Sequence, residues 1–540
     1  MQTQNSGLPA LPLADLAKAI DAQVLTSTEA ASGDPAAVSV QGISHDSRSV
    51  TTGELWVALP GQRTHGARFA EQALGNGPAA VLTDRQGAEL VRAADSAVPL
   101  LVTEAPRRAM ARAAALLMGE PARAMLTFGV TGTNGKTTTA FMIDSCLRTS
   151  GRHCGLIGTV GFLLDGEPLT GVRTTTVTTP ESPELQRILA TLVDSGADAM
   201  TMEVSSHALA LQRADAIDFD VVGFNNLGID HLDFHHTVDE YFEAKAQLFT
   251  PAHGRRAVIN IDDERGRTLA DRIRTAGELE LTTVSPSGAP ADVRVVRATP
   301  SGGHGSAVEF DIAGARHEVV VGLPGAHNVA NAALAAGMLF AAGLDLAACL
   351  PGLSTVRVPG RMEPVVLGSP STEEDPTTPY VVVDFAHTPT AVGAACSALA
   401  ESAEGPLVVV VGSGGDRDPA KRAPIGAHAA ENCDILVIAD DNPRTEDPAE
   451  VRAQVLAGGK QAVAEGARAR QVLDGGGRRE AVRLALDLAR QSATPGHRAT
   501  VAILGKGHET GQEINGVVHP YTDAGAANEG WAELQSGGDH

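Results

Sequence analysis

Apolar and polar positions follow two alternating patterns along the 540-residue chain. Short β-branched runs, such as Leu55–Leu59 and Ala79–Thr83, predict strands, and longer Ala/Leu-rich stretches, such as Ala105–Met118, predict helices. The two kinds of segment follow one another through most of the sequence. This order is typical of α/β proteins, in which helices pack on the faces of a sheet.

Two breaks divide the pattern into three blocks. Gly119-Glu120-Pro121 ends the first helical stretch, and a strand predicted at Met125–Val130 opens the second block. Residues 354–360 (STVRVPG) form a second predicted linker. The length alone predicts about two to four domains. We therefore expect three, at residues 1–122, 123–355 and 356–540.

Within the second block, helices are predicted at 238–248 and 328–343, and two strand-like runs surround a turn between residues 296 and 321. In the third block, the polar stretch 367–378 predicts a loop. Strands of the third block are predicted at Tyr380–Phe385, Leu407–Gly412, Ile435–Ala439 and Thr500–Leu504.

Composition narrows the classes of function. The net charge of −23 argues against non-specific binding to nucleic acid or to an anionic membrane surface. No apolar run reaches membrane-spanning length, and the first residues do not resemble a secretory signal. Five scattered cysteines without a Cys-x-x-Cys pair indicate a reducing compartment. We expect a cytoplasmic protein, taken as a monomer, that acts on small molecules.

The clearest chemical signal is a glycine-rich loop at residues 129–139 (GVTGTNGKTTT). It follows a predicted strand and opens a predicted helix, an arrangement that directs backbone N–H groups and the helix N-terminus at phosphates. Lys136 would contact the phosphates, and the Thr137 hydroxyl would bind Mg²⁺. Val130 stands where the strict phosphate-loop pattern has its first glycine. The alternative is an ordinary glycine-rich turn between a strand and a helix.

Two further segments offer ligands for a cation. Glu203 is predicted at a strand end, and residues 225–236 hold His231, two other histidines and two aspartates. Mg²⁺ prefers oxygen ligands beside phosphates. A zinc site is the competing functional interpretation, although zinc-type spacing is missing. A polar loop with locally bonded histidines is the structural alternative.

Lys245 lies among apolar neighbours on the helix predicted at 238–248, which begins with a capping box at Thr237 and Glu240. One interpretation is a lysine that extends along the surface to bring its ammonium group into solvent. The other is a functional amine near the phosphate loop.

Four polar motifs follow the predicted strands of the third block, and ligands of open α/β sheets bind at the carboxyl ends of strands. Arg417 and Arg444 offer guanidinium groups for carboxylates, and Asp441 and Glu509 could hold an ammonium group. A ligand with both groups, such as an amino acid, would satisfy this set. The motifs are Asp384-Phe-Ala-His387, residues 412–418 (GSGGDRD), residues 440–447 (DDNPRTED) and Gly505-Lys-Gly-His-Glu509.

Taken in this order, the motifs resemble those of the Mur ligase family, and the resemblance runs from about His45 to Asp523. It implies ATP-dependent amide formation between a carboxylate and an amino acid in peptidoglycan precursor synthesis. It also implies three domains: one that binds a UDP-sugar, a central P-loop ATPase domain, and a Rossmann-like C-terminal domain that binds the amino acid. In the family, the motif found here as Asp441-Asn-Pro-Arg444 occurs in ligases that add diaminopimelate rather than lysine.

The resemblance also implies roles for individual residues. Lys136, Glu203, His231 and Lys245 would be catalytic, with Lys245 carbamylated. Thr137, Glu203, His231 and the Lys245 carbamate would bind Mg²⁺. The residues implied for ATP are Gly132, Thr133, Asn134, Gly135, Lys136, Thr137, Thr138, Asn328, Arg361 and His387.

Two further sets concern the other substrates. The UDP-N-acetylmuramoyl dipeptide would contact Ser47, Gln62, Arg63, Thr64, Thr178, Thr179, Ser205 and Arg213. Diaminopimelate would contact Arg417, Asp441, Asn442, Pro443, Arg444, Gly505 and Glu509. The meso and LL isomers both remain open.

Three departures from the family pattern concern the UDP-linked substrate: Val177, Leu211 and Gly228-Ile229. The alternatives within the superfamily are the ligase of the next stem-peptide step and folylpolyglutamate synthetase, against which Asp441-Asn-Pro-Arg444 argues. A P-loop ATPase or GTPase without ligase activity is the alternative from a different class. A binding module without catalysis is a third, against which the phosphate loop, Glu203 and Lys245 argue.

Overall fold

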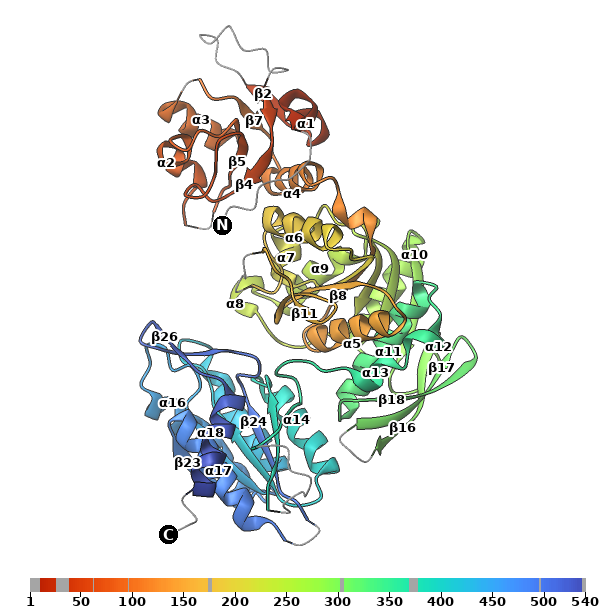
Figure 1. The fold of residues 1–540 in the computed structure, drawn as a ribbon, viewed down its shortest axis with the longest axis vertical. Helices are drawn as coiled ribbons and strands as arrows, with labels where there is room; N and C mark the ends of the chain where they lie inside the picture. Colours follow the sequence, from red (N-terminus) through yellow and green to blue (C-terminus); the bar gives the residue numbers. More distant parts are fainter. Residues whose placement is uncertain are drawn as a thin grey trace. The chain divides into compact units, whose positions relative to one another are not determined.

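The structure is a computed structural model that describes residues 10–25, 38–61, 63–95, 97–172, 177–301, 305–368, 377–494 and 497–536. Gln62 and residues 369–376 of the predicted loop lie outside this range. Helices alternate with strands through most of the chain, so the predicted α/β class is confirmed (Figure 1). The residues group into two compact units. The first unit comprises 1–294, 311–315 and 333–352, and the second comprises 295–310, 316–332 and 353–540.

The N-terminal sheet has the strand order β2-β7-β6-β5-β4. Strands β4 to β7 run parallel to one another, and β2 is antiparallel to β7. Side chains of β5 alternate between two cores, because successive residues of a strand face opposite sides of a sheet. Leu55 and Val57 pack with α1 and α4, whereas Trp56 and Ala58 pack with α2 and α3. The elements are α1 (Leu13–Ala19), β2 (Gln23–Leu25), β4 (Gly42–Ser44), β5 (Glu54–Ala58), α2 (Ala70–Leu74), β6 (Ala80–Thr83), α3 (Arg85–Ala94), β7 (Leu100–Val102) and α4 (Pro106–Leu117).

The central sheet has the order β11-β10-β9-β12-β8-β13-β14-β15-β16-β17-β18. Strand β8 lies between the parallel neighbours β12 and β13, and every residue of β8 after Leu126 is buried. The strands are β8 (Leu126–Thr131), β9 (Cys154–Gly158), β10 (Gly161–Leu164), β11 (Glu167–Pro168), β12 (Ala199–Glu203), β13 (Phe219–Phe224), β14 (Gly254–Asn260), β15 (Glu280–Ser285), β16 (Val293–Ser301), β17 (Gly305–Ile312) and β18 (Ala315–Val321). The helices are α5 (Lys136–Thr149), α6 (Ser182–Asp194), α7 (Ser206–Ala210), α8 (Leu232–His235), α9 (Val238–Ala246), α10 (Glu264–Ala276), α11 (Ala326–Ala341), α12 (Leu346–Cys349) and α13 (Gly352–Thr355).

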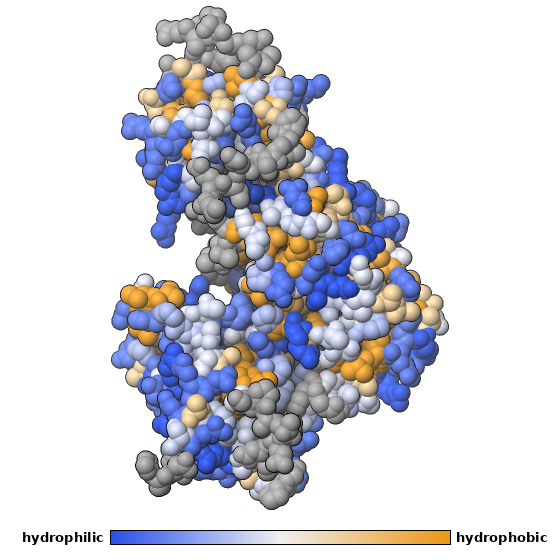
Figure 2. All heavy atoms as spheres, in the orientation of Figure 1, coloured by the Kyte–Doolittle hydropathy of each residue, from blue (hydrophilic) through white to orange (hydrophobic). Residues whose placement is uncertain are grey.

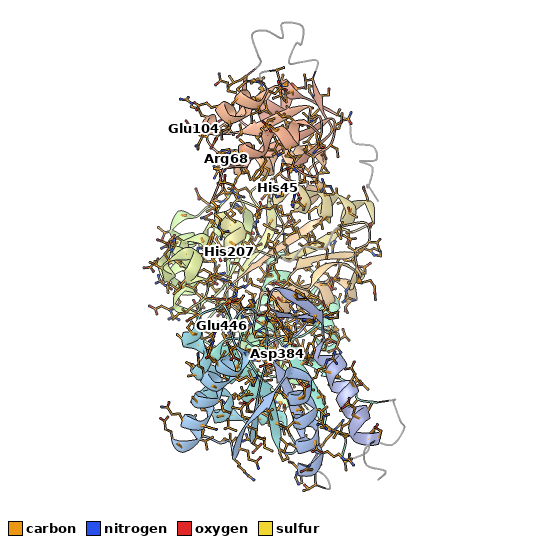
Figure 3. The ribbon with its side chains drawn as sticks, turned by 90° about the vertical axis from the view of Figure 1, so that its left-hand side faces the viewer. His45, Arg68, Glu104, His207, Asp384 and Glu446 are labelled. Atoms are coloured by element: carbon orange, nitrogen blue, oxygen red, sulfur yellow. The ribbon has the colours of Figure 1, made fainter. Side chains whose placement is uncertain are left out.

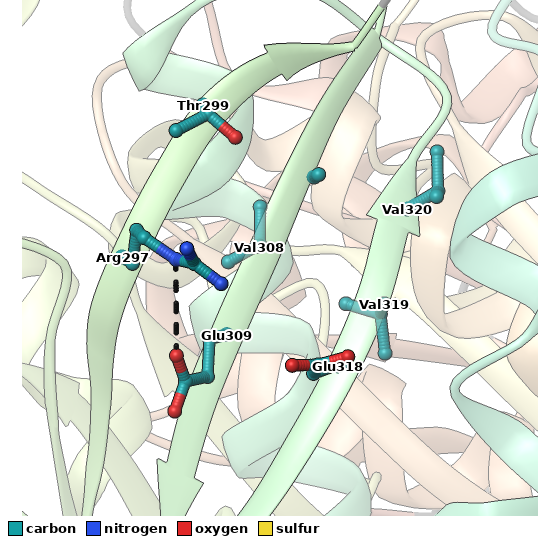
Figure 4. A pocket seen from close by; sticks show the side chains of 8 residues that line it. Arg297, Thr299, Val308, Glu309, Glu318, Val319 and Val320 are labelled. Carbon is teal, nitrogen blue, oxygen red and sulfur yellow. Dashed lines mark ion pairs between the residues drawn. The ribbon is translucent and has the colours of Figure 1, made fainter.

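Strands β17 and β18 confirm the two strand-like runs predicted around a turn between residues 296 and 321, and β16 is a further strand that the sequence did not predict. Three strands are present, and β16 begins earlier, at Val293. Most of β16 after Val295 is exposed and partly polar, so this strand does not form an apolar run in the sequence. A shallow hollow of about 260 Å³ lies on these strands (Figure 4). None of the predicted site residues line it; the lining residues are Arg297, Thr299, Ala307, Val308, Glu309, Glu318, Val319 and Val320.

The C-terminal sheet has the order β19-β20-β24-β21-β22-β23. All its strands run parallel except β19 at one edge, so the carboxyl ends of β20, β21, β22 and β24 meet at the same edge. The sequence did not predict β23. The elements are β19 (Glu363–Val365), β20 (Tyr380–Asp384), α14 (Pro389–Ser402), β21 (Leu407–Val411), α15 (Arg422–Asn432), β22 (Ile435–Ala439), α16 (Pro448–Ala464), β23 (Gln471–Gly476), α17 (Arg478–Ser492), β24 (Thr500–Leu504) and α18 (Asp523–Ser536).

A hairpin of β25 (Gly511–Ile514) and β26 (Val517–Pro520) follows β24. Asn515 and Gly516 form its turn with φ angles of 49° and 76°, in keeping with the Asn-Gly preference of hairpins. Val518 on β26 is 67% exposed, and Figure 2 shows an apolar patch over this hairpin. No helix among the residues described is long and apolar enough to cross a membrane.

Candidate functional site

The glycine-rich loop connects β8 to α5, as predicted. Gly135 precedes the helix with a φ of 82°, a backbone conformation that favours glycine. Two asparagines that follow β13 hold the loop: Asn226 accepts a hydrogen bond from the Asn134 N–H (2.9 Å), and Asn225 donates to the Asn134 carbonyl (3.2 Å). The loop conformation is therefore fixed by a neighbouring strand as well as by its own glycines.

Two lysines meet at one carbonyl oxygen of this loop. Lys136 Nζ donates to the Gly132 oxygen at 2.7 Å and to the Thr133 oxygen at 2.9 Å. Lys245 Nζ donates to the same Gly132 oxygen at 2.9 Å. The structure thus brings Lys245, from α9, to the phosphate loop.

Lys245 does not extend into solvent. Its side chain is 1% exposed, so the interpretation as a surface lysine is wrong. Burial, and secondarily the positive charge of Lys136, hold the pKa of Lys245 well below its ordinary value. The predicted helix cap is present, because the Thr237 hydroxyl accepts from the Glu240 N–H. The neutral amine is the form that this environment favours.

Oxygen ligands lie at the other end of the loop. The Thr137 hydroxyl donates to Glu203 Oε2 at 2.9 Å, and Glu203, at the end of β12, is 1% exposed. Thr159 also contacts this carboxylate, through its N–H at 2.8 Å and its hydroxyl at 3.1 Å. A hydroxyl and a carboxylate beside a phosphate loop are donors that suit Mg²⁺.

His231 stands in a group of aromatic side chains. Its ring lies edge-on to His207 with 4.8 Å between centroids, and its Nε2 is 3.5 Å from Asp230 Oδ2. Figure 3 labels His207 in the central part of the chain. Within the described ranges, no group of three or more His, Cys, Asp or Glu side chains is placed to hold a metal ion. The predicted cation ligands are therefore not gathered as a ready-made cage of such side chains.

The residues implied for the peptide part of the UDP-linked substrate form one network. The Thr179 hydroxyl donates to the Glu203 carbonyl at 2.8 Å and accepts from the Ser205 N–H at 3.2 Å. Arg213 donates to the Thr179 carbonyl at 3.1 Å and to Glu181 at 2.9 Å. Thr178 joins this network through the Thr159 hydroxyl at 3.1 Å.

Of the residues implied for the sugar part, Ser47 follows β4, and Arg63 and Thr64 follow β5. These strands are parallel neighbours, so both loops leave the same edge of the N-terminal sheet. Ser47 donates to Gln72 Oε1 at 3.0 Å, and Arg63 and Thr64 are exposed. Gln62 lies outside the described residues.

The second unit gathers polar side chains at the carboxyl edge of the C-terminal sheet. Figure 3 labels Asp384, which ends β20, and Glu446, which follows β22. Asn442 Nδ2 donates to Glu509 Oε2 at 3.0 Å, which joins two of the predicted motifs. Asp441 is 8% exposed and Glu509 35% exposed.

Arginine side chains lie beside these acids. Arg444 Nε is 3.1 Å from Glu513 Oε2, and Arg444 Nη1 donates to the Gly415 carbonyl at 2.6 Å. Its φ of 52° places Arg444 in the left-handed region, where an ordinary residue is strained. Arg417 is exposed on the loop after β21. Acidic and basic groups at one sheet edge form an arrangement that fits a ligand with both an ammonium and a carboxylate group.

Three further predicted residues also lie in the second unit. The guanidinium of Arg361 lies 4.3 Å from the centre of the Phe385 ring, and the His387 ring lies 4.7 Å from the same centre. Asn328 is 3% exposed; it donates to the Pro324 carbonyl at 2.7 Å and accepts from Asn331 at 3.2 Å. Arg361 and His387 therefore share one aromatic surface, whereas Asn328 braces the start of α11.

Several residues at these sites were given no role by sequence reasoning. They are Thr159, Glu181, Asn226, Tyr241, Phe385, Lys506 and Glu513. Lys506 and Phe385 lie inside motifs that the sequence had singled out, so position in a motif was an available signal. Glu513 ends the segment Thr510-Gly-Gln-Glu513, which directly follows the last of these motifs and also fits the family pattern, so it too had an available signal.

Comparison with known proteins gives consistent matches along the chain. Three family models match: "Mur ligase family, catalytic domain" at residues 39–117, "Mur ligase middle domain" at 130–339 and "Mur ligase, glutamate ligase domain" at 360–507. The chain is 44% identical to the UDP-N-acetylmuramoyl-L-alanyl-D-glutamate--2,6-diaminopimelate ligase of Streptomyces avermitilis, over 90% of this chain and 91% of that protein. It is 40% identical to the ligase of the same name from Corynebacterium glutamicum, over 94% and 95%. A solved structure of a ligase with this name matches with a TM-score of 0.66 and 30% identity, covering 95% of this chain and all of that one.

Proposed function

This chain belongs to the Mur ligase family, and we propose that it joins 2,6-diaminopimelate to the D-glutamate carboxylate of UDP-N-acetylmuramoyl-L-alanyl-D-glutamate at the expense of ATP. The choice of diaminopimelate as the amino acid is supported by the side chains at the carboxyl edge of the C-terminal sheet. There Asn442 donates to Glu509, and the Lys506 ammonium group lies 2.9 Å from Glu509 and 3.8 Å from Asp441. Arg444 pairs with Glu513, whose N–H donates to Asn442, so both signs of charge are present. The names of the relatives with 40% identity or more support the same substrate.

We assign the three ligands to three domains, at 1–122, 123–355 and 356–540. The first would bind the UDP-sugar through Ser47, Gln62, Arg63 and Thr64. The second would bind ATP on the loop Gly132–Thr138 and the peptide through the Thr179 and Arg213 network, which its hydrogen bonds support. The third would bind diaminopimelate.

The reaction proceeds in two transfers. The D-glutamate carboxylate attacks the γ-phosphorus of ATP, the bond to the β-phosphate oxygen breaks, and ADP leaves. The amine of diaminopimelate then attacks the acyl phosphate, phosphate leaves, and the amine gives up a proton as the amide forms. Two anions must approach in the first transfer, so Lys136 and the backbone N–H groups of the loop offset their repulsion.

The residues beside the loop fit Mg²⁺, which would supply further neutralisation of phosphate charge. Thr137 and Glu203 would hold one ion, with His231 near a second. Lys245 would contribute after carbamylation, in which its neutral amine bonds to the carbon of CO₂ and loses a proton. The buried position of Lys245 and its lowered pKa support this step, because only the neutral amine reacts.

We place the reaction in the cytoplasm and treat the active species as a monomer. The five cysteines are free and buried, as expected in a reducing compartment.

The decisive experiment offers the purified protein ATP, Mg²⁺ and the UDP-linked dipeptide together with meso-diaminopimelate, LL-diaminopimelate or L-lysine. We expect a UDP-linked tripeptide with one of the diaminopimelate isomers and none with lysine, detected by mass spectrometry. Phosphate release should require both the dipeptide and the amine. Release from ATP alone at the full rate would support an ATPase without ligase activity, and lysine incorporation would refute the choice of amino acid.

A further inference from the structure

Lys506 is a buried lysine in the strand-end group of the second unit. It follows Gly505 at the end of β24, and its side chain is 0% exposed. Burying an ammonium group is costly unless charged or polar partners surround it. Its contacts therefore show what the lysine does.

The partners of Lys506 are the acids and the amide assigned to the amino acid. Its Nζ donates to Asn442 Oδ1 at 3.0 Å and to Glu509 Oε2 at 2.9 Å, and lies 3.8 Å from Asp441 Oδ1. One ammonium group has three N–H donors, so it can contact all three side chains at once.

These contacts determine how Asn442 is turned. Its Oδ1 accepts from Lys506 and from the Glu513 N–H, at 3.0 and 2.9 Å, and both groups can only donate. The amide nitrogen must then face the other way, where it donates to Glu509 Oε2 at 3.0 Å. Lys506 and the Glu513 N–H together therefore fix the orientation of Asn442, and Lys506 and the Asn442 amide together hold the Glu509 oxygen that they share.

The same group has a charge that suits an amine. Lys506 carries one positive charge, and Asp441 and Glu509 carry one negative charge each, which leaves one negative charge. Arg478 also lies near Asp441, but its own buried partner Asp523 at 2.7 Å balances its charge. Glu509 remains 35% exposed, so a ligand can contact it.

We propose that Lys506 is a positioning residue for the amino-acid substrate: directly and through the Asn442 amide, it fixes the Glu509 carboxylate in the orientation that receives the substrate's ammonium group. This inference rests on the proposed function, because it takes diaminopimelate as the ligand of this edge. Lys506 acts through its two neighbours and does not itself contact the substrate.

The test compares Lys506→Met with the parent enzyme in the ligation assay. A positioning role predicts a KM for diaminopimelate raised about tenfold or more, the effect of losing a hydrogen bond to a charged group, with the KM for ATP within about twofold. An effect of charge alone would lower the KM for diaminopimelate, because removing a positive charge would favour binding of the substrate's ammonium group. An unchanged or lowered KM for diaminopimelate would overturn the inference.

Two controls separate positioning from loss of stability. Lys460→Met makes the same change on the exposed face of α16, and Leu399→Ala shortens a buried side chain of α14. Neither should raise the KM for diaminopimelate, even if Leu399→Ala lowers the melting temperature. Lys506→Gln, which keeps an N–H donor without the charge, should fall between the parent and Lys506→Met.

A double-mutant cycle with Asn442→Ala tests the route of the effect. If Lys506 acts through Asn442, the double variant should be about as impaired as the worse single variant, whereas independent effects would multiply. Multiplying effects would overturn the route through Asn442. If the parent enzyme ligates no diaminopimelate, the proposed function fails before any variant is compared. If the parent does and Lys506→Met keeps its KM, only the role of Lys506 fails.

Discussion

At the scale of the residue, the phosphate loop is notable for two lysine side chains on one carbonyl oxygen. Lys136 and Lys245 both donate to the Gly132 carbonyl, at 2.7 and 2.9 Å. Burial chiefly, and repulsion by the positive charge of Lys136 secondarily, lower the pKa of Lys245 and so disfavour a charged amine there. Conversion of Lys245 to a carbamate would replace this repulsion with an attraction, since the new group is an anion.

Lys245→Ala should therefore abolish ligation, with a loss far larger than that caused by a change on the surface of α9. Short carboxylic acids added to the assay should restore part of the rate if the missing group is a carboxylate. Product formation by mass spectrometry measures both effects. Glu243→Ala, on the exposed side of the same helix, is the matched control. Full activity of Lys245→Ala without added acid would refute the carbamate.

Asp144 on α5 gives a prediction of pH dependence. Its side chain is 1% exposed, and burial raises its pKa above the ordinary 3.8, against the opposing effect of Arg148 at 2.9 Å. The folded state therefore holds this proton more tightly than the unfolded state. The free energy of unfolding contributed by Asp144 should fall as the pH rises from 3.8 through the raised value.

Asp144→Asn should remove this fall. Urea unfolding of both proteins between about pH 4 and pH 7 measures it, and the difference between them isolates Asp144 from other groups. The variant should gain stability relative to the parent as the pH rises. A constant difference across this range would show that the pKa of Asp144 is not raised.

At the scale of the element, the sequence predicted the features whose physical cause is local. The strands Ile435–Ala439 and Thr500–Leu504 were predicted at their observed bounds, because each is an uninterrupted apolar run beside a polar motif. Strand β23 was missed because its residues are at most half-buried. The burial of Lys245 and Lys506 depends on partners from distant segments, Gly132 and Asn442, and periodicity contains no information about them.

Helices α15 and α16 pack through glycines at backbone distance. A Cβ atom on Gly426 would lie 2.0 Å from the Val455 carbonyl oxygen, and one on Gly458 would lie 1.9 Å from the Ala423 oxygen. Both neighbours are backbone atoms, so they cannot turn aside. The close approach of these helices supports β22, which leads to the Asp441 motif.

Gly426→Ala should lower the free energy of unfolding by about 1–3 kcal/mol or more, because the methyl group must push two helices apart. Denaturant unfolding measures this change. Gly393→Ala on α14 is the matched control: its nearest contact would be 3.5 Å away, at His428. Since alanine is the better helix former by about 0.5–1 kcal/mol, the control should be neutral or stabilising. Equal losses in both variants would contradict the packing argument.

At the scale of the whole molecule, a net charge of −23 contrasts with the anionic ligands proposed for the chain. Screening limits the reach of surface charge to about 8–10 Å at physiological salt, so nearby donors dominate at a binding site. Lys136, Arg213 and the loop N–H groups can therefore hold phosphates and carboxylates within an acidic protein.

The two compact units imply that unfolding is not a single two-state event. Scanning calorimetry should resolve more than one transition. Diaminopimelate at about 100 times its Kd should stabilise the transition of the second unit by about 2.7 kcal/mol, whereas that of the first should shift little. A fluorescent label on an exposed residue of each unit would assign the transitions. A single transition that diaminopimelate shifts as a whole would show that the units unfold together.

Asparagine residues in and near the proposed amino-acid site differ in how readily they can deamidate. Asparagine loses its amide when the next residue's backbone nitrogen attacks the side chain, and this requires an N–H. Asn442 is followed by Pro443, which has none, so the amide between Lys506 and Glu509 is protected from this route. Asn515 is followed by Gly516, the least hindered neighbour, in the exposed turn of β25 and β26. The chain has two other exposed asparagines followed by glycine, Asn76 and Asn134. Slow damage in stored protein should therefore occur at these three positions, of which Asn515 donates its backbone N–H to the Arg444 carbonyl at 2.7 Å, and should spare Asn442.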